Sequence, residues 1–530
     1  MAEQSRKIHL NEKQTEMLFY ISLVMIGLFV FLIIGSREPV LFDDSGSYMR
    51  IERIEGVMPV YPLFLLFNQY LFGNDKYLQI VIIEQAVLAV VSILIFVRVI
   101  KNKFVLRYWE AYLVFLLSLL PFTTEIPDSM ATQQILTEGL AYALFYLFMT
   151  VLLQAVWTKK FTWLAGTFVM TMILALVRSQ LQILFGVCGI VFLYLLWDRG
   201  GTTVKRLLGF LLGVAGCLLI SAAGIWITAK ATAGYDGLVR DNMTFNAFVM
   251  RIQDPRTYRE FSQDESGESK GGKEIEEAIR TKQEEIYAAV PSISTSQYTS
   301  LIFSRGMYEA DYEDIELFED EMIRGLYEVL YEATDHEKQR YAYEHRGLWM
   351  WRDIVGGIGR VGKTCRSVGI SYYQENYPEI YKADNFNSIW NRNLQTIGLE
   401  LLRKHKGRFV YHAMMMLPQA FICTVFFQIE PIYLLCHLVT LFLYLSAVAL
   451  MIWGYADKKT DKKCAEFMAL VLGSNVVMVV IISLVFFGQQ RYLVYNFGIF
   501  YAAYYILLRQ LWTSHIHDWV TGFRPSENRV

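Results

Sequence analysis

Charged residues and cysteines are both scarce in this chain of 530 residues. Asp, Glu, Lys and Arg make up 19% of it, whereas a soluble protein would carry about 25%. The six cysteines form no CxxC pair, and only Cys365 lies in the long polar region. This pattern predicts neither a disulfide framework nor a zinc site. No spacing of His, Cys and carboxylates suggests another metal, so we expect neither a metal nor a cofactor.

The sequence has long apolar runs instead. Residues 17–35 contain no charge over 19 positions, enough helix to cross a hydrocarbon core of about 30 Å. Similar runs occur at 78–97, 111–122, 139–157, 161–177, 181–197, 207–229, 431–453, 467–487 and 492–508. These runs exclude a soluble enzyme, a secreted disulfide scaffold and a nucleic-acid-binding protein. We predict an all-α polytopic membrane protein with about ten transmembrane helices.

Basic residues predict the orientation of these helices in the cell membrane. Four short connections (98–107, 158–160, 198–206 and 456–463) together hold 13 Lys and Arg, whereas the connection 123–133 on the other side holds none. The positive-inside rule therefore places both termini in the cytoplasm. This assignment requires that 409–428 does not cross the membrane. We expect an amphipathic helix there that lies in the outer interface or re-enters it, and an eleventh span stays an alternative.

Charge also divides the chain into regions. Residues 251–350 carry 12 basic and 23 acidic side chains. We predict three parts: an N-terminal transmembrane module (1–229) whose first outer loop is 36–76, an acidic and mostly helical extracytoplasmic domain (230–407), and an interfacial helix with the C-terminal spans (408–530). Within the second part, 263–272 (QDESGESKGG) is typical of a flexible segment.

Polar groups beside membrane spans are costly, so their positions suggest function. In the predicted topology several gather on the outer side. Carboxylates can act as general bases and arginines can bind phosphate, so this set suits a substrate that is both anionic and attached to lipid. The candidates are Asp43, Asp44, Tyr48, Glu138, Arg178, Arg491 and Tyr492.

Five short motifs resemble one family in the order in which they occur. FDDSGSYMRIERIEGVMPVYPLFLLF resembles the first outer loop of the GT-C glycosyltransferases, membrane enzymes that use polyprenyl-phosphate sugars and include protein mannosyltransferases and aminoarabinose transferases. ILTEGLAYALFYLFM resembles their Ser/Thr-Glu span. ALVRSQLQILFGV resembles their Leu-x-Arg-Pro turn, with Ser179 in place of Pro. LELLRKHKGRFVYHAM resembles their helix, His-Pro-Gly, helix segment, with Lys406 in place of Pro. GQQRYLVYNFGIF resembles their Arg-Tyr entry into a late span.

The resemblance implies a GT-C-like bundle with interfacial helices in the first outer loop. It implies an inverting, metal-independent sugar transfer from a polyprenyl-phosphate donor to a glycan, lipid or protein acceptor at the outer face. Asp44 would be the general base, with Asp43 and Glu138 beside it. Tyr48, Arg178, Arg491 and Tyr492 would bind substrate, the arginines at the lipid phosphate. Membrane lipids would be further partners, and nucleic acid would not.

Each assignment has a structural alternative. Asp43 and Asp44 could cap a helix, Glu138 could be an interfacial charge that the helix dipole favours at an N-terminus, and the arginines could extend to lipid headgroups. Other functions also stay open: a polymerase or ligase of lipid-linked glycans, a transporter or flippase, or a membrane scaffold. We find no internal repeat of the kind that transporters tend to show.

Overall fold

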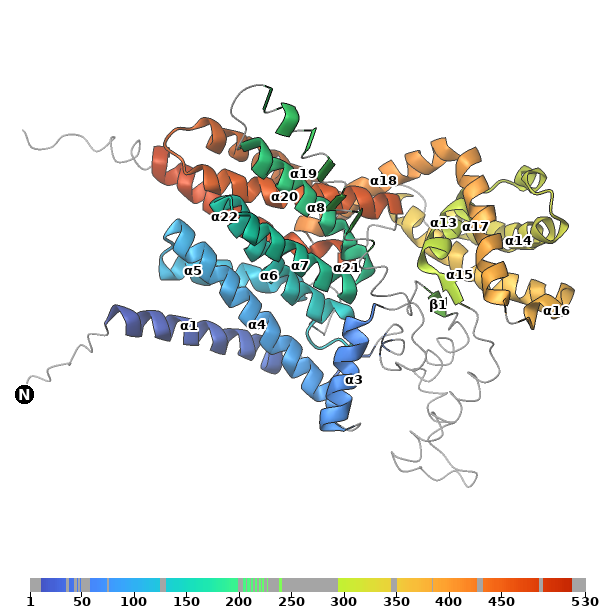
Figure 1. Cartoon of the computed structure of the whole chain (residues 1–530), viewed down its shortest axis with the longest axis horizontal. Helices are drawn as coiled ribbons and strands as arrows, with labels where there is room; N and C mark the ends of the chain where they lie inside the picture. Colours follow the sequence, from blue (N-terminus) through green and yellow to red (C-terminus); the bar gives the residue numbers. More distant parts are fainter. Residues whose placement is uncertain are drawn as a thin grey trace, which may run out of the picture.

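A computed structural model places most of the chain as an elongated molecule, with a bundle of long helices beside a smaller helical unit (Figure 1). It describes residues 11–34, 38–41, 58–73, 76–123, 130–198, 238–240, 294–344, 350–383, 385–426, 432–485 and 490–516, together with Ser45, Tyr48 and scattered positions between 204 and 226. Within these residues the chain is almost entirely helical. The predicted flexible segment 263–272 and about half of the predicted span 207–229 lie outside them.

The apolar runs form helices at nearly the predicted positions. Within the described part of the chain, six helices are long and apolar enough to cross a membrane, as in an all-α polytopic membrane protein. Four of these are α1 (Glu12–Phe29, extended by the π-turn η1, Val30–Ile34), α4 (Tyr77–Phe104), α6 (Thr137–Thr158) and α8 (Leu184–Asp198, after the 3-10 turn η4, Ser179–Ile183). The other two are α19 (Tyr433–Ala456) and α20 (Lys462–Val485).

Shorter helices complete the bundle. They are α5 (Tyr108–Leu119, extended by η3, Leu120–Thr123), α7 (Phe161–Val177), α21 (Gln490–Leu493), the 3-10 turn η7 (Val494–Asn496) and α22 (Phe497–Leu511, followed by η8, Trp512–Ile516). At 1.5 Å per residue a 17-residue helix such as α7 spans only about 25 Å. The count of ten spans therefore stays a prediction.

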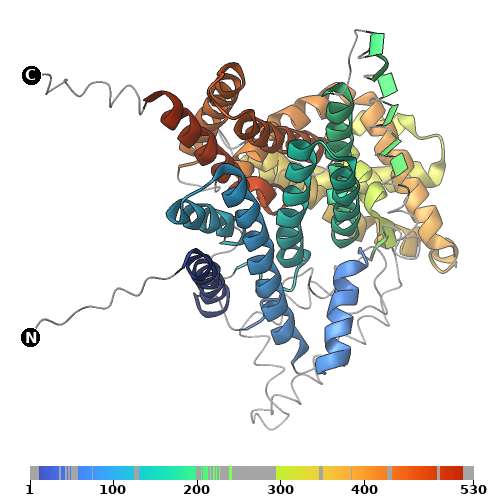
Figure 2. The same cartoon turned by 60° about the vertical axis from the view of Figure 1, so that its left-hand side comes forward.

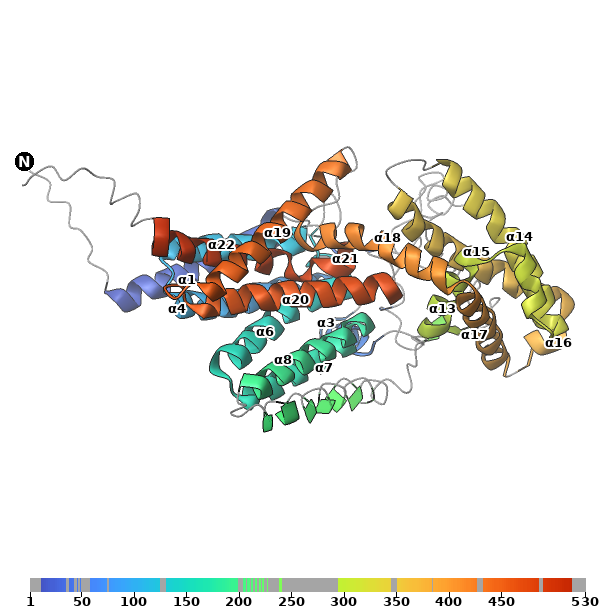
Figure 3. The same ribbon diagram turned by 90° about the horizontal axis from the view of Figure 1, so that it is seen from above.

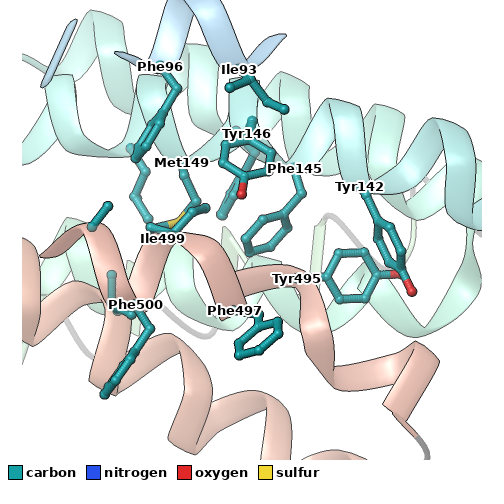
Figure 4. Close-up of a cluster of buried hydrophobic side chains, with 14 of the residues drawn as sticks. Ile93, Phe96, Tyr142, Phe145, Tyr146, Met149, Tyr495, Phe497, Ile499 and Phe500 are labelled. Carbon is teal, nitrogen blue, oxygen red and sulfur yellow. The ribbon is translucent and has the colours of Figure 1, made fainter. Parts of the chain in front are cut away.

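The N-terminal and C-terminal parts of the bundle share one hydrophobic core. Helix α6 is apolar all round and packs with α4, α7 and α20, as expected of a helix at the centre of a bundle. Aromatic side chains from α4 and α6 face others from η7 and α22 (Figure 4). Phe145, for example, lies 5.2 Å from Tyr495 between ring centroids. The predicted boundary at residue 229 divides the sequence, but helices before it and helices after residue 408 pack in one core.

The first outer loop contributes one described helix, α3 (Val60–Phe72), which packs on α4 beside α7 (Figure 2). Pro59 begins it and Gly73, at φ 75°, ends it. Asn68 donates a 2.8 Å hydrogen bond to Glu84 of α4, so this acidic residue of the second span has an amide partner. Several large apolar side chains on the other face of α3 are exposed, among them Phe67 and Leu71, which suits contact with lipid.

The smaller unit consists mainly of helices between residues 297 and 404, which have their own hydrophobic core, and includes one short pair of strands. Its elements are β1 (Leu238–Arg240) paired antiparallel with β2 (Ser294–Ser296), α13 (Gln297–Glu309), η5 (Tyr312–Leu317), α14 (Glu321–Glu344), α15 (Met350–Asn376), α16 (Pro378–Tyr381) and α17 (Phe386–Lys404). Helices α13 and α17 approach closely because Gly306 faces Gly398. A Cβ on Gly306 would lie 2.7 Å from the Gly398 carbonyl oxygen. We call α13–α17 the helical unit.

Helix α18 (Lys406–Val425) connects the helical unit to the bundle (Figure 3). It follows α17 after a break at His405 and packs against α15 on one side and α20, α21 and α22 on the other. Its last residues, including Ala420 and Cys423, are buried in the bundle core. This helix is not among the six candidate spans. Of the two predicted positions, its buried C-terminal half favours re-entry over a position on the surface.

A polar junction fixes the start of α18 against the segment that follows α13. Asp314, fully buried, binds Lys404 Nζ at 2.6 Å and His405 Nε2 at 2.7 Å, and Asp311 binds Arg408 at 2.8 Å. Burial alone would raise the pKa of Asp314, but hydrogen bonds from the Asp311 backbone, Lys404 and His405 outweigh it and lower the pKa. The hydrogen bond from Arg408 likewise lowers the pKa of Asp311.

Asp314→Asn is expected to lower the free energy of unfolding of the helical unit by about 2 kcal/mol, because it takes the buried carboxylate away from the largely buried His405 and the partly exposed Lys404. Since the folded pKa is depressed, this contribution is present above the ordinary value of 3.8 and is lost as the pH falls below it. Hydrogen exchange of the α17 amides in the full chain measures it. Glu316→Gln, at an exposed carboxylate of η5, is the control and should change stability by less than about 0.5 kcal/mol.

The basic connections gather at the end of the bundle remote from the helical unit. Lys103 lies 5.4 Å from the ring of Trp157, next to the 158–160 turn, and Arg509 of α22 bonds to the carbonyls that end α4. The connections 98–107, 158–160 and 456–463 thus lie at the end of the bundle opposite the helical unit (Figure 1).

A labelling experiment tests which end faces out. Single cysteines at Glu328 of α14 and Lys459 of the α19–α20 connection are both at exposed positions. An impermeant thiol reagent on intact cells should label the first and spare the second, because only the helical unit is expected outside. The five described native cysteines are buried and should give little background in the unsubstituted chain. The opposite pattern would invert the topology.

Candidate functional site

The segment after the first span is attached to the segment that leads into α6. The backbone N–H of Val40 donates to Gln133 at 2.9 Å, and Val40 accepts from Ile135 at 3.0 Å. The Gln85 side chain of α4 donates to the carbonyls of Thr132 and Gln134 and so fixes the same segment. Gly139 permits this arrangement, since a Cβ there would lie 2.7 Å from the Ala131 carbonyl oxygen. The first outer loop therefore begins beside the N-terminus of α6.

A buried ion pair occupies that N-terminus. Glu138, in the first turn of α6, is 1% exposed, and its Oε1 lies 2.6 Å from Nη1 of Arg178. Thr137 Oγ1 donates to the other carboxylate oxygen at 3.1 Å. Arg178 follows the last residue of α7 in an extended conformation that turns its side chain towards α6. The pair compensates two charges that would each be costly to bury alone, and the helix N-terminus favours the carboxylate.

Tyrosines from distant parts of the chain surround Arg178. The ring centroid of Tyr492, in α21, lies 4.8 Å from the guanidinium carbon, a cation–π contact. Tyr495 packs edge-on against Tyr142 at 5.0 Å, and the two rings lie side by side at one end of the aromatic cluster (Figure 4). Turns more than 300 residues apart in sequence thus meet at Arg178. Arg491 adjoins Tyr492 in α21, but its side chain is outside the described residues.

Tyr48 and α3 lie on another side of this ion pair. The Tyr48 ring packs edge-on against Tyr61 of α3, 5.3 Å between centroids. Tyr61 is completely buried, close enough to Glu138 for electrostatic interaction, and its hydroxyl has no hydrogen-bond partner among the described residues. Asp43 and Asp44 lie outside the described residues. The next residue, Ser45, is described and buried.

The ion pair itself and the three tyrosines around it (Tyr61, Tyr142 and Tyr495) were not predicted from the sequence. Glu138 was expected as a catalytic group and Arg178 as a phosphate ligand or a residue reaching lipid headgroups. Its side chain is only 11% exposed and binds Glu138, so it does not extend outwards. The sequence did contain one signal for this pair, because Glu138 and Arg178 have opposite charges and lie at the same predicted end of neighbouring spans.

A second ion pair, partly buried at the opposite end of the bundle, offers an arginine with structural contacts for comparison. Arg509 binds Glu110 at 2.5 Å and also donates to the backbone carbonyls of Phe104 and Val105, which end α4. Such an arginine caps a helix. The contacts described for Arg178 are instead to the Glu138 carboxylate and the Tyr492 ring. Its ion pair uses Nη1, which is one of the nitrogens that carry the five N–H donors of a guanidinium.

The described residues contain no group of three or more His, Cys, Asp or Glu arranged to hold a metal. Comparisons with known protein families, characterised proteins and solved structures find no match to this chain.

Proposed function

We propose that this chain is a membrane glycosyltransferase that moves a sugar from a polyprenyl-phosphate donor to an acceptor hydroxyl at the outer face of the cell membrane. The observation that carries the proposal is the buried Glu138–Arg178 pair with Tyr492 against the guanidinium. Its three residues belong to three of the family-like motifs, and Tyr48 of a fourth approaches it through Tyr61. The GT-C-like arrangement of about ten spans, with both termini cytoplasmic, is part of the proposal.

Arg178 would hold the lipid phosphate. A guanidinium matches phosphate oxygens in a bidentate way, and the donors that the Glu138 contact leaves over can serve this purpose. Arg491, one residue from Tyr492, would supply a second cation. Glu138 would orient Arg178 and keep it charged in a buried position. This role fits the ion pair better than general-base catalysis by Glu138.

The reaction would proceed in one displacement. Asp44 takes the proton of the acceptor hydroxyl, whose oxygen forms a bond to the anomeric carbon. The bond between that carbon and the phosphate oxygen breaks, and the electron pair stays on the lipid phosphate. The phosphate gains negative charge as it leaves, and the arginine site stabilises it. Attack opposite the leaving group inverts the anomeric centre. Asp43 would support Asp44 as a neighbour or a helix cap.

Binding of the lipid alone tests the proposal before the sugar is known. Purified protein in nanodiscs should bind a long-chain polyprenyl phosphate, detected by native mass spectrometry, and the matched polyprenol without phosphate should bind much more weakly. Equal binding of the two lipids would contradict a phosphate site. Preference for a polyprenyl diphosphate that carries an oligosaccharide would instead favour a polymerase or ligase of lipid-linked glycans.

A further inference from the structure

Arg305 is a buried charge that the proposed reaction does not use. It belongs to α13 of the helical unit and is 2% exposed. Its Nη2 donates to the carbonyl oxygen of Ser483 at 2.7 Å and approaches that of Leu484 at 3.4 Å. Both carbonyls lie in the last turn of α20. The side chain thus reaches from the helical unit into the membrane bundle.

The end of α20 is a suitable partner for this cation. The last carbonyls of a helix lack partners within the helix and carry the negative end of its dipole. Phe409 of α18 lies 5.1 Å from the guanidinium carbon, which adds a cation–π contact. Burial lowers the pKa of Arg305 to about 10, and nearby Glu309 opposes that effect, so the side chain is charged at neutral pH.

The turn that Arg305 holds leads directly to the candidate site. Helix α20 ends at Val485, and α21 begins at Gln490 with Arg491 and Tyr492. Helix α18, which carries Phe409, also packs against α21 and η7 (Figure 3). Contacts from the helical unit therefore reach α21 through the end of α20 and through α18. At α21, Tyr492 contacts Arg178.

We propose that Arg305 is a positioning residue for the lipid-phosphate site: by holding the last turn of α20, it sets the position of α21 and hence of Tyr492 against Arg178. This inference rests on the proposed function for its chemical outcome. Its structural part, the fixing of α21 by the helical unit, is measurable without any substrate. The helical unit would then help to build the site in addition to any contact with an acceptor.

The experiment compares three variants of the full chain in nanodiscs. In Arg305→Ala, hydrogen exchange should become faster at the end of α20 and in α21, and polyprenyl phosphate affinity should fall about 10-fold, the scale of one hydrogen bond to a charged group. Arg305→Lys should recover part of both, since an ammonium can donate to the same carbonyls. Arg324→Ala removes an exposed arginine of α14 in the same unit and should leave both unchanged.

Each outcome decides one claim. Unchanged exchange in α20 and α21 would overturn the positioning role. Faster exchange with unchanged affinity would overturn the link to the site. If the unsubstituted chain does not bind polyprenyl phosphate, the proposed function fails, and the exchange result still decides whether Arg305 positions α21. If Arg305→Ala does not fold, Phe409→Leu, which removes only the ring beside the guanidinium, should shift both readouts in the same direction by less.

Discussion

Asp44→Asn is expected to slow sugar transfer by about 100-fold or more, the usual contribution of a general base. Asparagine keeps the size and most of the hydrogen bonding of aspartate but cannot take a proton from the acceptor. Polyprenyl phosphate binding should survive, because the base acts on the acceptor and does not hold the donor. The measurement is the turnover rate at saturating donor, together with lipid affinity from native mass spectrometry.

Asp43→Asn is the matched control for this prediction and should slow transfer less. Residues on both sides of the pair are fixed in the structure: Val40 bonds to the segment before α6, Ser45 is buried, and Tyr48 packs on Tyr61. Turnover close to that of the unsubstituted chain in Asp44→Asn would remove the base assignment and weaken the family interpretation with it.

The positions of the long helices could be predicted because apolar runs of about 20 residues carry their own structure in a membrane. Helices α1, α4, α6, α19 and α20 all include most of their predicted runs. The limits of α18 were also close to the prediction. The burial of its C-terminal half could not be predicted, because apolar residues such as Ala420 and Cys423 suit a membrane interface and a protein core equally.

Which helices pack together could not be predicted from one sequence. Nothing in the run 161–177 indicates that Arg178 meets Glu138 and Tyr492, since these contacts join turns that are far apart in the chain. Arg305 shows the same limitation. Within α13 it is an ordinary polar residue of a helical segment, and its role depends on two carbonyls of α20 nearly 180 residues later.

Arg178→Ala is expected to weaken polyprenyl phosphate binding by about 10- to 100-fold, the range for losing hydrogen bonds between charged groups. Transfer should slow as well, because the phosphate gains charge in the transition state. Arg178→Lys should rescue only partly, since an ammonium cannot bind two phosphate oxygens in the guanidinium geometry. Glu138→Gln leaves Arg178 in place but removes the carboxylate that orients it, so lipid binding should weaken less than in Arg178→Ala.

Breaking a buried ion pair also costs stability, so the structural and functional contributions of Arg178 have to be separated. Arg509→Ala breaks the corresponding pair with Glu110 at the opposite end of the bundle and should destabilise the protein without changing lipid affinity. The double variant Glu138→Gln with Arg178→Gln removes both charges. It should recover stability relative to Arg178→Gln alone, because no carboxylate is left buried without its partner, while lipid binding stays weak. If lipid affinity recovers together with stability, Arg178 is a structural residue and the phosphate site lies elsewhere.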